Sequence, residues 1–122
     1  MPPNYTRRFI TKDEIQVSLV PERGRDYKKL EESRRTEDQQ LYGAIKQAFA
    51  TLKETPDAGK HIANDRIPKE YTRQHGLGVS FWKYDILGSC RLIYTVGHTE
   101  GLILVTLIEW MSHADYERRF KY

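Results

Sequence analysis

Three side chains in the second half of this chain have the chemistry needed to act on a phosphodiester: Arg91, His113 and Tyr116. An arginine guanidinium matches a phosphate with two parallel hydrogen bonds. A histidine that is neutral near pH 7 accepts a proton, and aromatic rings stack on bases of any sequence. Brought together on RNA, such groups would activate a 2′-hydroxyl for attack on the adjacent phosphate while the arginine stabilises the developing charge.

The segments around these residues predict that they meet. Residues 79–84, 91–96 and 102–108 are rich in β-branched and aromatic side chains, which is typical of strands. Glycines in 85–88 and 97–101 favour hairpin turns between them. Antiparallel pairing then places the start of the second strand, with its arginine, beside the end of the third strand, which the histidine follows.

The C-terminal segment adds a helix to this end of the sheet. Ser112, with Asp115 three residues later, is a capping pattern that predicts a helix beginning at His113. A helix N-terminus disfavours imidazolium, so the histidine would stay neutral and basic. The i,i+3 spacing brings His113, Tyr116 and then Arg119 or Phe120 to one side.

The hairpin lengths also predict a register. A loop over 97–101 pairs Val96 with Leu102 and brings Arg91 opposite about Leu107, and a turn over 85–88 brings Arg91 near Trp82 or Lys83. Alternation along the middle strand predicts one face toward the helices and one open face. The helix-facing residues would be Leu92, Tyr94 and Val96, and the open face would carry Arg91, Ile93 and Thr95.

The first part of the chain supplies the elements that cover this sheet. Residues 1–14 are predicted to form a polar arm and 15–122 one domain. Ile15, Val17 and Leu19 alternate with polar residues, which predicts a short strand ended by Pro21.

Two helices are predicted next. Asp26 would cap a first helix that runs to about Arg35, and Thr36 with Gln39 would form the capping box of a second. The second helix has one apolar stripe and ends at Thr55-Pro56. The stripe residues are Leu41, Ile45, Ala48, Phe49 and Leu52. The predicted class is α+β, with an N-terminal strand, a helical hairpin, a three-stranded antiparallel meander and a short C-terminal helix, the helices covering one face.

Segment 57–78 is less regular, with a short helix expected from Pro68 to Gly76. It contains four cations that would serve either as a phosphate-binding edge or as a solvated loop. They are Lys60, Arg66, Lys69 and Arg73.

Composition limits the function further. The chain has 122 residues, a net charge of +3 and a pI near 9.0, a mild preference for anionic partners. A single cysteine, Cys90, excludes an internal disulfide and favours a reducing cytoplasm. The N-terminus lacks a secretory signal pattern, and the longest apolar run is too short to span a membrane. The histidines lack metal-ligand spacing, and no CxxC, Walker loop or GxGxxG is present, so no metal and no cofactor are expected.

Each candidate also has a purely structural interpretation. Arg91 would pair with Glu109 or Asp85 at a strand end, and His113 would simply begin a helix. Three aromatic residues would pack in the core or as a lid, namely Trp110, Tyr116 and Phe120. Cations near a helix C-terminus are ordinary, which applies to Arg118, Arg119 and Lys121.

The order of short motifs resembles the RelE/ParE superfamily of toxins, closest to the RelE and YoeB-like mRNA interferases of type II toxin–antitoxin systems. RLIYTV at 91–96, a glycine-bearing turn, an apolar strand and SHADY at 112–116 carry the resemblance, with IPK at 67–69 and WKY at 82–84 before them. The resemblance covers about 15–122. The arm before Ile15 is longer than is usual in that family.

This resemblance implies a cytoplasmic, metal-independent endoribonuclease that cleaves mRNA, often on the ribosome, and is held inactive by a cognate antitoxin. It assigns Arg91 to the scissile phosphate and His113 and Tyr116 to proton transfer or base stacking. The implied RNA-binding residues are Arg66, Lys69, Lys83, Arg118 and Arg119. The general base stays open among Asp65, Glu70 and Glu109. The alternatives are a ParE-like toxin that binds gyrase, a non-catalytic protein-binding module of the same fold, or an inert relative.

Overall fold

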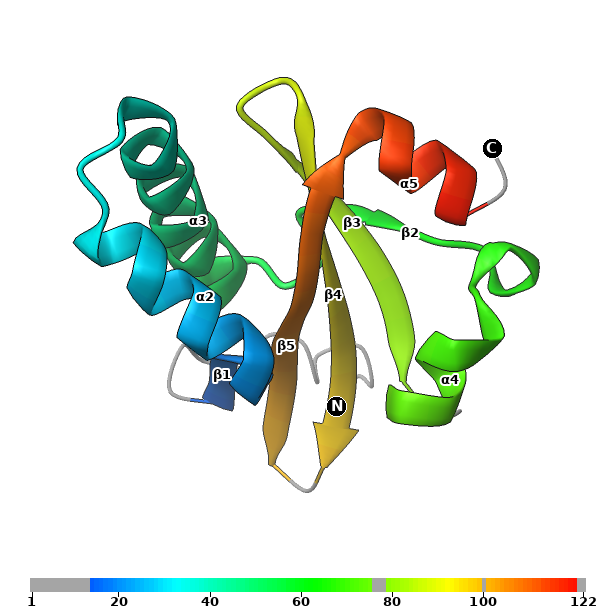
Figure 1. Ribbon diagram of the computed structural model, residues 1–122. Coiled ribbons are helices and arrows are strands. Elements are labelled where there is room, and N and C mark those ends of the chain that lie inside the picture. The colour runs from blue at the N-terminus through cyan, green and yellow to red at the C-terminus, as the bar shows by residue number, and fades with distance from the viewer. Residues whose placement is uncertain (1–13, 76–78, 100, 121–122) are drawn as a thin grey trace.

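The computed structural model describes residues 14–75, 79–99 and 101–120, and the elements within them form an α+β structure (Figure 1). Except for Glu14, the expected arm lies outside the described residues, as do Gly76 and Lys121. The strands are β1 (Ile15–Leu19), β2 (Lys60–His61), β3 (Ser80–Ile86), β4 (Cys90–Thr99) and β5 (Leu102–Ser112). The helices are α2 (Pro21–Glu32), α3 (Thr36–Glu54), the 3₁₀ turn η2 (Asn64–Arg66), α4 (Lys69–His75) and α5 (His113–Arg119).

The strands form one mixed sheet in the order β1-β5-β4-β3-β2. The central pairs, β3 with β4 and β4 with β5, are antiparallel, while β1 runs parallel to β5. The sheet therefore has five strands where the sequence predicts four. The unpredicted strand is β2, whose two residues are too few for an alternating pattern to be visible.

The predicted register of the second hairpin is wrong by three residues at Val96 and, beyond an irregularity between Ile93 and Tyr94, by four at Arg91. Val96 lies opposite Val105, and Arg91 lies opposite Met111 on one side and Asp85 on the other. The reason is that both strands extend through the segments expected to be loops, because the turns are tighter than predicted. Leu87 (φ 56°) and Gly88 (φ 70°) make the first turn, and Gly101 (φ 76°) supports the second.

Helices cover both faces of the sheet, which corrects the prediction that they cover one (Figure 1). On one face, α3 packs its predicted apolar stripe against the residues of β4 that were expected to meet the helices, and Ile45, Ala48 and Leu52 are buried there. On the other face, α4 and α5 form a second core. Its buried members are Ile62, Ile67, Tyr71, Phe81, Ile93, Ile108, Met111, Tyr116 and Phe120.

Two of the predicted helix starts change. The first helix begins at Pro21, because proline at the first helical position needs no hydrogen-bonded N–H, and Asp26 lies inside it. Thr36 is already helical, so it does not form the expected cap. Ser33 links the two helices instead: its Oγ accepts from the Arg35 N–H at 3.1 Å and donates to Asp38 at 2.7 Å.

Other predictions are confirmed. The first strand has the expected bounds, and the short helix α4 follows Pro68. The Ser112 Oγ accepts from the Asp115 N–H at 3.1 Å, which caps α5 as expected. Within the described residues, no helix combines the length and apolar character needed to cross a membrane.

Candidate functional site

A cluster of three cations, Lys60, Lys83 and Arg91, lies on the sheet face that carries α5. Lys60 is directly opposite Lys83 across β2 and β3, and Arg91 lies on β4 two residues from Ile93, which is opposite Lys83. Residues directly opposite in an antiparallel pair project from the same face, and like charges there repel. We call this group the basic cluster. The basic cluster contains the predicted site residues Arg91 and Lys83 together with Lys60, which the sequence predicts in the irregular segment 57–78.

Tyr116 forms the base of the basic cluster. The Lys83 Nζ lies 5.6 Å from the centroid of the Tyr116 ring, and the Arg91 Cζ lies 4.6 Å from it, both within cation–π range. The ring is fully buried and stacks on Phe120 with centroids 4.6 Å apart. In this conformation Tyr116 positions the two cations and has no free face for a base.

One carboxylate faces the basic cluster. The Arg91 Nε and the Asp85 Oδ1 are 3.1 Å apart, so the predicted ion pair at the strand end is with Asp85. The Nε is buried and has no hydrogen bond among the described residues. Burial, Arg91 and Lys60 lower the pKa of Lys83, and Asp85 opposes them in part. The repulsion among the three cations is thus only partly compensated.

His113 lies at the same end of the sheet as Arg91, as predicted. Its backbone N–H donates to the Ser89 carbonyl at 3.2 Å, beside the pair Cys90–Ser112. The side chain is half-buried, and its Nε2 is buried without a hydrogen-bond partner in the parts of the chain that the structure describes. The polar contacts described for Arg91 do not include His113, so the two share a location but no direct bond.

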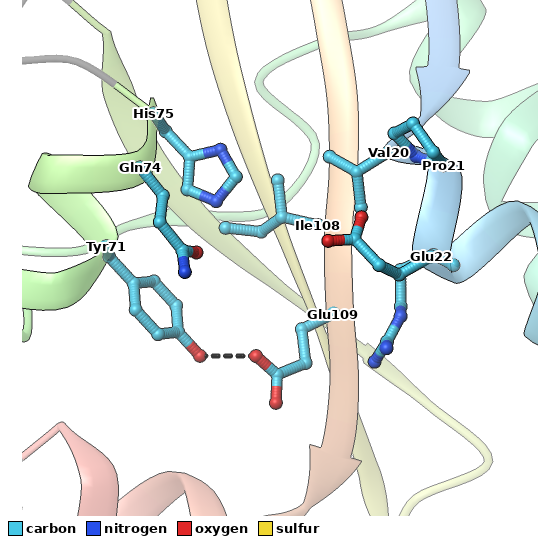
Figure 2. Close-up of a pocket in the computed structure, with 9 residues that line it drawn as sticks. Val20, Pro21, Glu22, Tyr71, Gln74, His75, Ile108 and Glu109 are labelled. Atoms are coloured by element: carbon cyan, nitrogen blue, oxygen red, sulfur yellow. Dashed lines mark hydrogen bonds between the residues drawn. The ribbon is translucent and has the colours of Figure 1, made fainter.

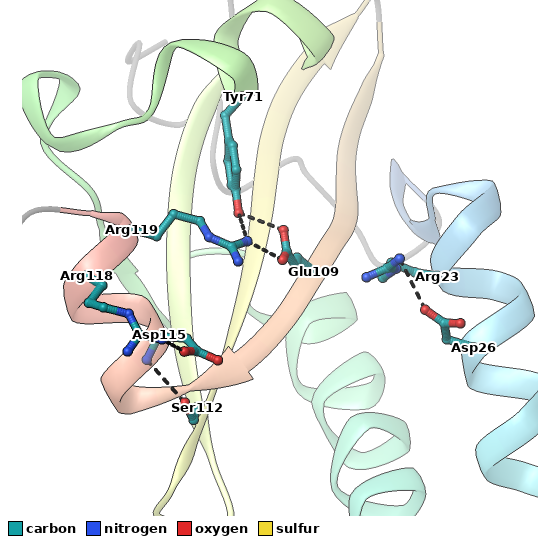
Figure 3. Close-up of polar contacts among 8 residues, drawn as sticks. All are labelled: Arg23, Asp26, Tyr71, Glu109, Ser112, Asp115, Arg118 and Arg119. Carbon is teal, nitrogen blue, oxygen red and sulfur yellow. Dashed lines mark hydrogen bonds and ion pairs between the residues drawn. The ribbon is translucent and has the colours of Figure 1, made fainter.

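The two arginines of α5 are engaged with carboxylates (Figure 3). Arg118 forms an exposed ion pair with Asp115, one turn back on the helix. Arg119 pairs with Glu109 and donates to the Tyr71 hydroxyl at 3.2 Å. The Tyr71 hydroxyl in turn donates to Glu109 at 2.6 Å, and burial with this bond raises the pKa of Tyr71.

The predicted residues Arg66 and Lys69 lie elsewhere. Arg66 ends η2 and Lys69 begins α4, both in the connection between β2 and β3. They lie outside the three strands that carry the basic cluster.

A second feature, absent from the sequence analysis, is a cleft of about 500 Å³ on the same face (Figure 2). Its floor is Ile108 and Glu109 of β5, and its two walls are the start of α2 and the helix α4. The wall residues are Val20, Pro21, Glu22, Arg23, Tyr71, Gln74 and His75. These come from distant segments, so no local motif indicates them.

Titratable groups in the cleft affect one another. Burial lowers the pKa of His75, and the carboxylates of Glu22 and Glu109 oppose this. Within the described ranges, no group of three or more His, Cys, Asp or Glu residues could hold a metal ion.

Comparisons with family models, curated proteins and solved structures give no significant match to this chain.

Proposed function

We propose that this protein is a RelE-like toxin that cleaves mRNA in the cytoplasm, and that a cognate antitoxin holds it inactive. The observation that carries the proposal is the basic cluster, in which cations of β2, β3 and β4 lie together on one sheet face, with the carboxylate of Asp85 paired to Arg91. The motifs of the resemblance contain two of these cations, Lys83 in WKY and Arg91 in RLIYTV, and SHADY adds His113 and Tyr116.

The basic cluster suits a phosphate for an electrostatic reason. Lys60 opposite Lys83 costs free energy when no anion is bound. The pKa of Lys83 is lowered mainly by burial, and then by repulsion from Arg91 and, least, from Lys60. A phosphate between Lys83 and Arg91 would relieve the repulsion, because it would add negative charge beside both cations.

The proposed reaction is an in-line transfer on RNA. His113 takes the proton of the 2′-hydroxyl, and the 2′-oxygen attacks the phosphorus while the P–O5′ bond breaks. Lys83, whose lowered pKa eases proton release, protonates the leaving 5′-oxygen. Arg91 stabilises the charge on the phosphate, Tyr116 positions both cations, and the products are a 2′,3′-cyclic phosphate and a 5′-hydroxyl. Arg118 and Arg119 would contact the RNA backbone by exchanging their carboxylates for phosphates.

Mapping of RNA 5′ ends after induction in cells tests the proposal. We expect growth arrest and new 5′-hydroxyl ends in mRNA from the wild-type chain. Arg91→Ala and His113→Ala should lower cleavage at least 100-fold, and Arg91→Lys should fall between because it keeps the charge without the guanidinium fork.

The matched control is Arg34→Ala, which removes an exposed arginine in the connection between α2 and α3. It should leave cleavage and toxicity unchanged, and circular dichroism should show that all variants are folded. Full toxicity of both Arg91→Ala and His113→Ala would show that this site is wrong. Intact mRNA together with blocked DNA supercoiling would favour the ParE-like alternative.

A further inference from the structure

The cleft beside the basic cluster has binding groups that the proposed reaction does not use. Figure 2 shows the side chains of Glu22 and of Gln74 and His75 directed toward each other from opposite walls, above Ile108. Within the described residues, none of these three side chains has a hydrogen bond or an ion pair. We propose that the cleft binds a guanine base of the RNA, an inference that rests on the proposed function.

The lining of the cleft mixes polar and apolar surface, which suits a ligand that has both an apolar ring and polar edges. Its volume of about 500 Å³ is within the range of small-molecule sites. Ile108, Val20 and Pro21 supply apolar surface, and the rings of Tyr71 and His75 lie nearly edge to face at 6.3 Å. Unpaired bases are recognised by such apolar and aromatic surfaces combined with hydrogen bonds to their Watson–Crick edges.

The charges in the cleft argue against a phosphate there. Among the described lining residues, Glu22 and Glu109 are acidic, and the guanidinium of Arg23 is 3.1 Å from Asp26 and lies over the Trp110 ring at 5.9 Å. Glu109 is already bonded to Tyr71 and Arg119. Apart from the Arg23 Nε, which is buried and has no hydrogen bond among the described residues, the remaining binding groups are an acceptor at Glu22, an amide at Gln74 and an imidazole at His75.

Guanine is the base that these groups match. A carboxylate only accepts hydrogen bonds, and it can accept two in parallel. Guanine alone presents two adjacent donors, N1–H and N2–H, on its Watson–Crick edge, and its O6 beside them would accept from the Gln74 amide. Adenine and cytosine offer a single amino group there, and uracil a single N–H.

The position of the cleft agrees with a base that neighbours the scissile phosphate. Glu109, in the floor of the cleft, lies opposite Ile93, two residues along β4 from Arg91. At about 3.3 Å per residue this is about 7 Å along the strand, within reach of one nucleotide. A phosphate at the basic cluster and a base in the cleft could thus belong to one RNA strand.

Nucleoside titrations of the full chain, followed by ¹⁵N–¹H NMR, test the cleft without any cleavage. Guanosine should shift the side-chain signals of Gln74 and His75, and adenosine, cytidine and uridine should bind at least tenfold more weakly. Glu22→Gln, which loses one acceptor oxygen, should weaken guanosine at least tenfold. Glu32→Gln, an exposed glutamate at the far end of the same helix, is the matched control and should bind as the wild type does.

Cleavage mapping separates this inference from the proposed function. Guanine enriched at a fixed distance from the cut in the wild type, and lost in Glu22→Gln, supports the cleft. Guanosine binding without RNA cleavage keeps the cleft and overturns the nuclease. RNA cleavage without base preference, together with no guanosine-induced NMR shift, would support the nuclease and contradict guanine binding in the cleft. Equal binding of all four nucleosides would also contradict guanine binding.

Discussion

Tyr94→Phe tests how the segment that carries the basic cluster is held in place. The Tyr94 side chain is fully buried on β4, and its hydroxyl makes two hydrogen bonds to the connection between α3 and β2. It donates to the Pro56 carbonyl at 2.8 Å and accepts from the Gly59 N–H at 3.1 Å. Phenylalanine keeps the packed ring and removes both bonds, so the turn before Lys60 loses its attachment to the sheet.

The expected loss follows from these two bonds. Each is worth about 1 kcal/mol net, and the buried groups left behind add some desolvation cost, so the free energy of unfolding should fall by about 2–3 kcal/mol. At about 4 °C per kcal/mol for a chain of this size, Tm should fall by about 8–12 °C. Urea unfolding followed by far-UV circular dichroism measures the change, and an unaltered m-value would show that the unfolded state is the same.

Tyr84→Phe is the matched control, because the structure describes no hydrogen bond for that half-buried hydroxyl among the residues it covers. It should change the free energy of unfolding by less than about 0.5 kcal/mol. If Tyr94→Phe also costs less than about 0.5 kcal/mol, the two bonds do not anchor the turn and the reasoning fails.

The same residue gives a pH signature. Burial raises the pKa of Tyr94 from 10.0 to about 12. Between these values the folded state keeps a proton that the unfolded state has lost, so stability falls as pH rises. The wild type should therefore lose more stability than Tyr94→Phe between pH 10 and pH 12, measured by urea unfolding at each pH.

Two further predictions concern the glycines and the cleft histidine. Gly59→Ala would place a Cβ in overlap with the Lys83 carbonyl oxygen and 2.8 Å from the Tyr94 hydroxyl, and should cost about 3 kcal/mol in urea unfolding. Gly43→Ala, with open space around it in α3, should instead stabilise by about 0.5–1 kcal/mol, and equal effects of the two would contradict the geometry. Because burial lowers the pKa of His75 below 6.5, the folded state binds fewer protons than the unfolded state just below that pH, so stability should fall as pH drops through 6.5. His75→Gln should lose less stability than the wild type between pH 7 and pH 5, and an identical loss would exclude His75 as a source.

Local patterns were sufficient to predict much of this fold. The apolar stripe of α3, the helix-facing residues of β4 and the Ser112 cap each depend on neighbours within a few residues, and each is confirmed, whereas the expected open face of β4 is covered because α4 and α5 pack on it. The prediction that Arg91 and His113 lie at one end of the sheet is also confirmed. It depends only on the antiparallel direction of neighbouring strands, so an error of a few residues in the register does not change it.

What the sequence did not predict depends on contacts between distant segments. The pairing of Lys60 with Lys83 needs β2, which exists because Gly59 lets the backbone approach β3 closely and Tyr94 holds the turn. The cleft forms only because α2 begins at Pro21, five residues before the predicted cap, and so faces α4 across β5.

The C-terminal aromatic residues show why packing and function need not be competing explanations. Tyr116 and Phe120 are core residues in every structural sense, being fully buried and stacked. Yet the side chains of Lys83 and Arg91 both lie over the Tyr116 ring, which attracts them. Replacing Tyr116 with leucine would keep the apolar core and remove this cation–π attraction. A residue inside the core can therefore position the charged side chains that lie on it.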